Sequence, residues 1–141
     1  MATDVKKTFR DYIEAWNSHD LERIVSYVTD DIVFEDVAMA RVMRGREELK
    51  GFGKDSFVAF PDFKIELKVI FTSGNWAGAE WFMSGTFLGD SPGLSPTGKS
   101  FSVRGASICE LRGGKLRRES LYYDGLTFLQ ALGVMPGMPS E

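Results

Sequence analysis

The sequence contains little histidine and little cysteine, with one of each in 141 residues. A structural zinc site takes about four such ligands, so we expect no metal site of that type. The lone cysteine, Cys109, cannot form a disulfide within the chain. The N-terminal stretch MATDVKKTFRDY lacks the apolar core of a signal peptide. Together these features lead us to expect a cytoplasmic protein.

Long apolar runs and an excess of positive charge are also missing. No run approaches the roughly 18 apolar residues of a membrane span. The chain has 17 Lys and Arg against 20 Asp and Glu, a net charge of −3, whereas nucleic-acid binding needs a basic surface. Its one basic cluster, Lys115 with Arg117 and Arg118, is offset by Glu110 and Glu119. We expect no nucleic-acid partner and no membrane partner.

Aromatic residues, by contrast, are plentiful at 13% of the chain. They provide more large apolar surface than a minimal core needs, which fits a ligand cavity or a subunit interface. The length allows one domain, which we place at residues 1–134. Residues 135–141, MPGMPSE, look like a flexible tail.

The spacing of apolar residues predicts four helices. Residues 4–17 carry apolar side chains every three or four positions, and a second helix is expected over 21–28, capped by Ser18 or Asp20. A turn at Arg44-Gly45-Arg46 leads into a third helix over 47–60, which Pro61 ends. A short fourth helix follows Asp124.

Alternation predicts strands over 32–36, 63–71, 77–88, 101–111 and 116–123. In the first strand, Asp36 shares a face with Phe34. In the second, Val69 and Phe71 share the core face and Ile70 lies outside. Helices followed by a meander of strands predict an α+β architecture.

Five segments carry a resemblance to a known family: YIEAWNSHDLERIVSYVTDDIVFED, RGREELKGF, FPDF, PTGKSF and GGKLRRESLYYDGLTFLQALG. The chain resembles the nuclear-transport-factor-2-like superfamily, and within it the SnoaL-like polyketide cyclases and their relative ketosteroid isomerase. The resemblance implies a curved antiparallel or mixed sheet wrapped around helices into a cone with an apolar pocket. It also implies a homodimer or a larger assembly. Because members include enzymes and proteins without chemistry, the fold leaves the function open.

Asp124 is the first candidate catalytic residue. The YYDGL segment matches the position at which SnoaL-like cyclases have an aspartate that acts as general acid and base. A carboxyl in an apolar pocket has a raised pKa, which suits that role. The alternative is that Asp124 caps the last helix. Regular alternation gives one face to Leu121 and Tyr123 and the other to Tyr122 and Asp124, and it leaves open which face meets the pocket.

Two further candidates come from the resemblance to ketosteroid isomerase. Asp36 stands where that enzyme has the base that moves a proton between carbons, with a solvent-facing acid as the alternative. Tyr12 stands where it has a tyrosine that stabilises an oxyanion. The alternative for Tyr12 is plain packing beside Phe9 and Trp16.

The chain departs from the isomerase on the third strand of the meander. The second acid of that enzyme falls near Ala106 or Ser107, and neither residue is acidic. Arg104 is expected to supply the polar group there, with Glu110 or Glu119 as its partner across strands. The only histidine, His19, lies in a turn between helices and is expected to be structural.

The preferred hypothesis is a cofactor-free enzyme that closes an aldol ring or isomerises an apolar, carbonyl-bearing small molecule. Asp124 would move the proton, assisted by Asp36, Tyr12 and Arg104, and no metal would be needed. A non-catalytic binding or assembly module of the same fold and an epoxide hydrolase are the alternatives. The side chains expected to contact the ligand are Trp16, Phe34, Phe57, Phe60, Trp81, Met83 and Tyr123.

Overall fold

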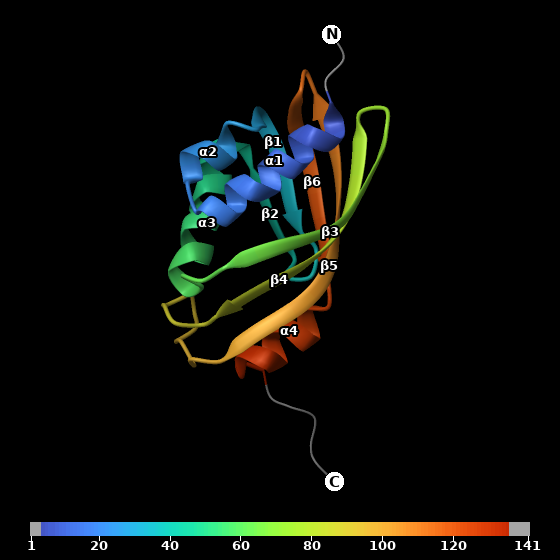
Figure 1. Cartoon of the computed structure of the whole chain (residues 1–141). Helices are drawn as coiled ribbons and strands as arrows, with labels where there is room; N and C mark the ends of the chain where they lie inside the picture. The colour runs from blue at the N-terminus through green and yellow to red at the C-terminus, as the bar shows by residue number, and fades with distance from the viewer. Residues whose placement is uncertain (1–3, 136–141) are drawn as a thin grey trace.

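The computed structural model describes residues 4–135, which form four helices and six strands (Figure 1). In chain order they are α1 (Val5–Ser18), α2 (Leu21–Val25), β1 (Val28–Asp36), β2 (Arg41–Arg44), α3 (Gly45–Ala59), β3 (Lys64–Ser73), β4 (Trp76–Thr86), β5 (Ser100–Arg112), β6 (Lys115–Tyr123) and α4 (Gly125–Leu132). The expected tail, apart from Met135, lies outside the described residues.

All six strands join one curved sheet in the order β2-β1-β6-β5-β4-β3. Strands β3 to β6 form the expected antiparallel meander, and β1 pairs with β6 in parallel. Helix α1 packs against β3 and β4, α3 against β1 and β2, and α4 against β5 (Figure 1). The expected α+β architecture is confirmed. No helix among residues 4–135 is long and apolar enough to cross a membrane.

Three of the helices begin at an aspartate that caps the first turn. Asp4, Asp20 and Asp124 each have extended backbone angles, and each accepts a hydrogen bond from the backbone N–H three residues later. Such a cap satisfies one of the amide groups that the first turn leaves without a partner. The predicted cap of α2 at Asp20 is therefore confirmed.

The sheet begins earlier in the chain than the sequence pattern predicts. Helix α2 ends at Val25 instead of Val28, because the carbonyl of Tyr27 already accepts a bond of 2.9 Å from the N–H of Leu116. Strand β1 then begins at Val28 and contains an irregularity before Val33. The polar residues Asp30 and Asp31, which follow the helix expected over 21–28, lie in that irregularity and pair with Arg46 and Arg112.

Two more expectations are corrected along the chain. Residues 41–44, where only a turn at Arg44 was expected, form the edge strand β2, which is too short and too polar to show alternation. In β3 the pairing register shifts between Leu67 and Val69. The resulting bulge turns Ile70 into the core (7% exposed) and leaves Val69 and Phe71 exposed.

The outer edge of β3 is partly closed by side chains from the end of α1. The Asn17 amide donates to the carbonyl of Ile65 (2.9 Å) and accepts from its N–H (2.7 Å). Next to it, the His19 ring bonds the carbonyl of Phe63 (2.8 Å) and stacks on Phe57. His19 is therefore structural, as expected. These contacts fix α1 across the sheet, which positions the cavity described below.

Replacing Asn17 with alanine tests this attachment. The change leaves the N–H and the carbonyl of Ile65 without their protein partners, so we expect the free energy of unfolding to fall by about 1–3 kcal/mol. Urea denaturation measures it. Glu14→Ala, at an exposed position of the same helix, is the control and should change stability by less than about 0.5 kcal/mol. Equal effects of the two changes would contradict the role given to Asn17.

Candidate active site

A cavity of about 360 Å³ lies between the inner face of the sheet and helices α1, α3 and α4. Its wall is mainly aromatic and aliphatic, as in most small-molecule sites. The aromatic lining residues are Trp16, Phe34, Phe52, Phe60, Phe63, Trp81, Phe87, Phe101, Tyr123 and Phe128. The acidic lining residues are Asp36, Asp55 and Glu119. No group of three acidic, histidine or cysteine side chains that could hold a metal ion occurs within residues 4–135.

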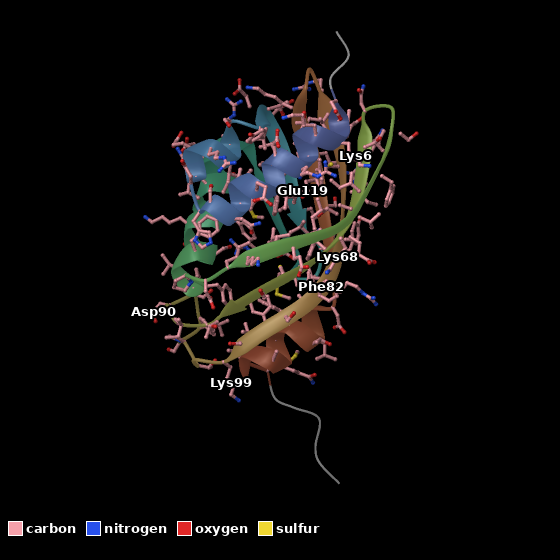
Figure 2. The ribbon with its side chains drawn as sticks, in the orientation of Figure 1. Lys6, Lys68, Phe82, Asp90, Lys99 and Glu119 are labelled. Carbon is pink, nitrogen blue, oxygen red and sulfur yellow. The ribbon has the colours of Figure 1, made fainter. Side chains whose placement is uncertain are left out.

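Glu119 is the most deeply buried of these acids. It lies on β6 between Phe34 of β1 and Cys109 of β5, and only 2% of it is exposed. Figure 2 labels Glu119. Burial raises its pKa to about 7, because the charged form is poorly solvated there. Hydrogen bonds from Tyr12 and Ser107 act in the opposite direction. Glu119 can therefore gain or lose a proton near neutral pH.

Tyr12 stands behind Glu119 and does not line the cavity. Its side chain is fully buried, and its hydroxyl donates a hydrogen bond of 2.7 Å to Oε1 of Glu119. Burial, followed by the charge of Glu119, raises the pKa of Tyr12 well above its ordinary value. The Tyr12 hydroxyl, which was expected to stabilise a ligand oxyanion, thus bonds to Glu119.

Ser107 and Trp81 complete the surroundings of Glu119. Both line the cavity, and the indole Nε1–H of Trp81 donates to Oγ of Ser107 at 2.9 Å. Ser107 stands near the position at which the isomerase has its second acid. It contributes a buried hydroxyl at that end of the cavity, while the acid comes from β6, the neighbouring strand.

Asp36 forms a second carboxyl site on the cavity wall, as its alternation with Phe34 predicted. It is 4% exposed. Tyr123 donates to its Oδ2 (2.9 Å) and the N–H of Met39 to its Oδ1 (3.1 Å). Burial raises the pKa of Asp36, while these bonds and the charge of Arg41 oppose that shift. Asp36 lies opposite Leu121, so it is two residues along the sheet from Glu119.

Asp124, the first candidate, lies outside the cavity wall. Its exposed carboxylate accepts hydrogen bonds from the N–H (3.0 Å) and the hydroxyl (2.6 Å) of Thr127. These bonds lower its pKa, the reverse of what a proton donor near neutral pH needs. Asp124 therefore caps helix α4, which is the alternative given for it above.

Two other expected site residues also lie elsewhere. Arg104 is exposed on the outer face of β5 opposite Phe82, because the inward positions of that strand are Val103, Gly105 and Ser107. Its expected partner Glu110 pairs with Arg117 instead. Phe57 is not on the cavity wall but packs against Trp16 and His19.

The remaining expected contact residues do line the cavity: Trp16, Phe34, Phe60, Trp81, Met83 and Tyr123. Leu121 and Tyr123 belong to the inward face of β6, which settles the alternation of that strand. Glu119 shares that face at two-residue spacing, and this was the signal in the sequence that could have identified it. Its neighbours in sequence, Arg117 and Arg118, are instead typical of an acid that pairs with arginines.

The buried acid should make stability depend on pH. Folded Glu119 holds its proton up to about pH 7, whereas an unfolded glutamate loses it near 4.5. Its contribution to the free energy of unfolding is therefore fully present below about pH 4.5 and is lost as the pH rises through 7. We expect urea denaturation of wild type to show a loss of about 3 kcal/mol between pH 4.5 and 8 relative to Glu119→Gln. Parallel pH profiles of the two proteins would contradict a buried, titrating Glu119.

Known structures share this fold. AclR of Streptomyces galilaeus, a candidate hydroxylase, superposes with a TM-score of 0.81 at 24% identity, over 96% of this chain and 85% of that one. IdmH of Streptomyces antibioticus, a candidate polyketide cyclase, gives 0.78 at 24% identity, over 93% and 99%. A hypothetical protein of Catenulispora acidiphila with a ketosteroid isomerase-like fold, in complex with trimethylamine, gives 0.80 at 19%, over 95% and 96%.

These similarities show that the α+β cone expected from the resemblance, the nuclear-transport-factor-2-like fold, is correct. No curated protein shows a significant match to the sequence. The family profile described as SnoaL-like polyketide cyclase matches residues 6–132, almost all of the chain. The chain therefore belongs to the SnoaL-like polyketide cyclase family.

Proposed function

We propose that the protein is an enzyme that moves a proton at a carbon next to a carbonyl group in an apolar small molecule. Aldol ring closure or isomerisation would follow from the resulting enolate. The observation that supports this is one buried glutamate, Glu119, with a pKa of about 7 on the wall of an apolar cavity. Acid and base catalysis is most efficient when the pKa lies near the working pH.

Two of the three carboxyl groups on the cavity wall, those of Asp36 and Glu119, would share the proton transfer. One carboxylate takes the proton from carbon, and the electron pair of the C–H bond moves to the carbonyl oxygen. The other group, as a neutral acid, donates to that oxygen. In an isomerisation the base returns the proton to another carbon of the enolate. In a ring closure the enolate carbon attacks a second carbonyl, and the oxygen of that carbonyl takes the proton from the base. Asp36 and Glu119 suit this chemistry because burial raises the pKa of both carboxyl groups, while Arg41 opposes that rise at Asp36.

This chemistry uses side chains of the protein alone, and we include the absence of a cofactor in the proposal. The epoxide hydrolase alternative needed Asp36, Asp124 and Arg104 around one water. Because Asp124 and Arg104 are not on the cavity wall, we do not propose that reaction. Cys109 is a buried free thiol, which suits a reducing compartment, and we place the protein in the cytoplasm.

Exchange of deuterium into 2-tetralone tests the proposal without the natural substrate. This bicyclic ketone is apolar and carries acidic hydrogens next to its carbonyl, so proton abstraction appears as deuterium uptake in NMR spectra. We expect wild type to accelerate the exchange and Glu119→Gln to lower the protein-dependent rate by about 100-fold or more, because the amide cannot transfer a proton.

Asp124→Asn is the matched control for this experiment. It removes a carboxylate that caps a helix outside the cavity, so the exchange rate should stay within about threefold of wild type. A loss of exchange in Asp124→Asn with full activity in Glu119→Gln would contradict the proposal. Binding of ketones without any exchange by wild type would favour the non-catalytic binding module.

We also propose that the outer face of the sheet joins two copies of the chain. Exposed apolar side chains gather there: Phe71 (65% exposed) lies over Gly78, and Gly78 pairs with Ile108 (47%). On the same face, Nζ of Lys68 lies over the ring of Phe82, 5.6 Å from the ring centroid (Figure 2). An exposed apolar patch of this kind is typical of an interface between proteins.

Light scattering after size exclusion tests this association. We expect wild type at about twice the chain mass of 15.8 kDa, because the dimer buries the apolar patch. Ile108→Glu should run as a monomer, since it places a charge in the middle of the patch. Leu126→Glu, at an exposed position of α4, should leave the mass of the dimer unchanged. A monomeric wild type would contradict the proposal.

A further inference from the structure

The wall of the cavity is uneven in charge. Three carboxyl groups line it, those of Asp36, Asp55 and Glu119. Among the lining residues that the structure describes, Arg41 is the only one with a cationic side chain. A negatively charged group on a ligand is repelled by ionised acids and loses its hydration beside apolar side chains. Arg41 is therefore the one place on the described wall that attracts such a group.

Strands β1 and β2 and helix α3 together position Arg41. It is the first residue of β2 and lies opposite Asp36 of β1 in the antiparallel pair. Its guanidinium lies over the ring of Phe52 of α3, 5.2 Å from the ring centroid. A guanidinium that packs on an aromatic face is held through its planar surface, while its N–H groups point along the edges of that plane. The contact therefore holds the cation in place and leaves its donors available.

The protein itself does not use these donors. Within residues 4–135, the side chain of Arg41 forms no ion pair and no hydrogen bond. Asp36, its neighbour across the strands, accepts instead from Tyr123 and from the N–H of Met39. Because Arg41 is exposed and also lines the cavity, it lies where the cavity opens to solvent. Its five N–H groups can bond to a ligand that enters there.

A carboxylate is the anion that best matches Arg41. Its two oxygens accept two parallel N–H bonds from one guanidinium. A phosphate also binds arginine, but it carries about two negative charges, and one guanidinium cannot balance both on a wall that also holds Asp36 and Asp55. The rest of the wall is mainly apolar. The matching ligand therefore has one carboxylate at its edge and an apolar body.

We propose that the ligand of this cavity is an apolar carbonyl compound that also carries a carboxylate, and that this carboxylate binds the guanidinium of Arg41. The proposal rests on the proposed function for the cavity and deepens it by naming the substrate class. Arg41 is then a residue that determines specificity. It orients the ligand with the anionic end at the opening beside β2 and α3, and with the apolar body toward the interior of the cavity.

A matched pair of ligands, 2-naphthoate and 2-naphthamide, tests the proposal. Both have the same two fused rings and a planar substituent of nearly the same size, and they differ in charge. Isothermal titration calorimetry at pH 7.5 gives both dissociation constants. We expect wild type to bind naphthoate about tenfold more tightly than naphthamide, because a hydrogen bond between two charged groups is stronger than one to a neutral amide. Raising the salt concentration from about 50 to about 500 mM should reduce this preference, because salt screens exposed charges.

Three variants separate the charge of Arg41 from a merely structural role. Arg41→Gln should remove the preference for naphthoate, while naphthamide binds within about threefold of wild type, because the apolar wall is unchanged. Arg41→Lys retains the charge without the planar pair of donors and should give an intermediate preference. Asp55→Asn is the matched control, since it removes a charge of the opposite sign from the same wall. It should retain or increase the preference for naphthoate.

The indole N–H signals of the three tryptophans show where the ligand binds. Trp16 and Trp81 line the cavity, whereas Trp76 is exposed at the start of β4 and does not line it. In NMR spectra of the nitrogen-15-labelled protein, naphthoate should move the signals of Trp16 and Trp81 and leave that of Trp76 in place. Naphthamide should move the same two signals in Arg41→Gln, which shows that the cavity of this variant is intact.

The proposal is overturned if Arg41→Gln keeps the preference for naphthoate or if Asp55→Asn loses it. Equal binding of the two compounds by wild type, failure of both to bind, or a shift of the Trp76 signal alone also overturns it. Exchange of 2-tetralone by a protein without the preference would leave the proposed function standing and overturn this proposal alone. A preference that depends on Arg41, without exchange of 2-tetralone, would support the carboxylate site and contradict the proposed catalysis.

Discussion

The bond between Tyr12 and Glu119 is the interaction on which the rest of the site depends. It joins α1 to β6 through the core, and it lies where two large polar side chains are removed from water. A buried carboxyl is costly unless it is neutral or well hydrogen-bonded, and here both conditions contribute. Tyr12 donates its hydrogen bond to this acid from the side away from the cavity, so Glu119 can lie among apolar side chains. Any change in how α1 lies on the sheet would alter the electrostatics of the cavity.

The cavity repeats one arrangement at two places, a carboxyl group bonded by a tyrosine. Glu119 with Tyr12 lies deep, while Asp36 with Tyr123 lies beside a backbone N–H and the cationic Arg41. The same chemical pair therefore has different proton affinities, set by solvation and by nearby charge. One fold can host many functions because the side chains of its site change while the scaffold stays constant.

The sequence predicted the fold better than the site, for a physical reason. Helical spacing and strand alternation report which residues must be buried together, and they located α1, α3 and the meander. Short or irregular pairing, as in β2 and at the bulge after Leu67, depends on contacts distant in sequence and leaves no periodic signal. Asp36 was found because it alternates with Phe34. Glu119 follows Arg117 and Arg118, and an acid in such a charged stretch resembles one on a solvent-facing strand. The YYDGL motif draws attention to Asp124, but a sequence motif does not report whether the side chain is buried.

The closed edge of β3 bears on how the molecule behaves in a crowded solution. A free strand edge is a template on which another chain can add a strand, and this sheet has β3 as its last strand. Asn17 and His19 occupy the backbone groups of Phe63 and Ile65, and the bulge beyond Leu67 bends the remaining edge out of register. The pairing of another strand with β3 is thereby blocked at the start of this edge and disfavoured beyond the bulge. The contacts that orient the first helix over the cavity thus also keep neighbouring molecules apart along this edge.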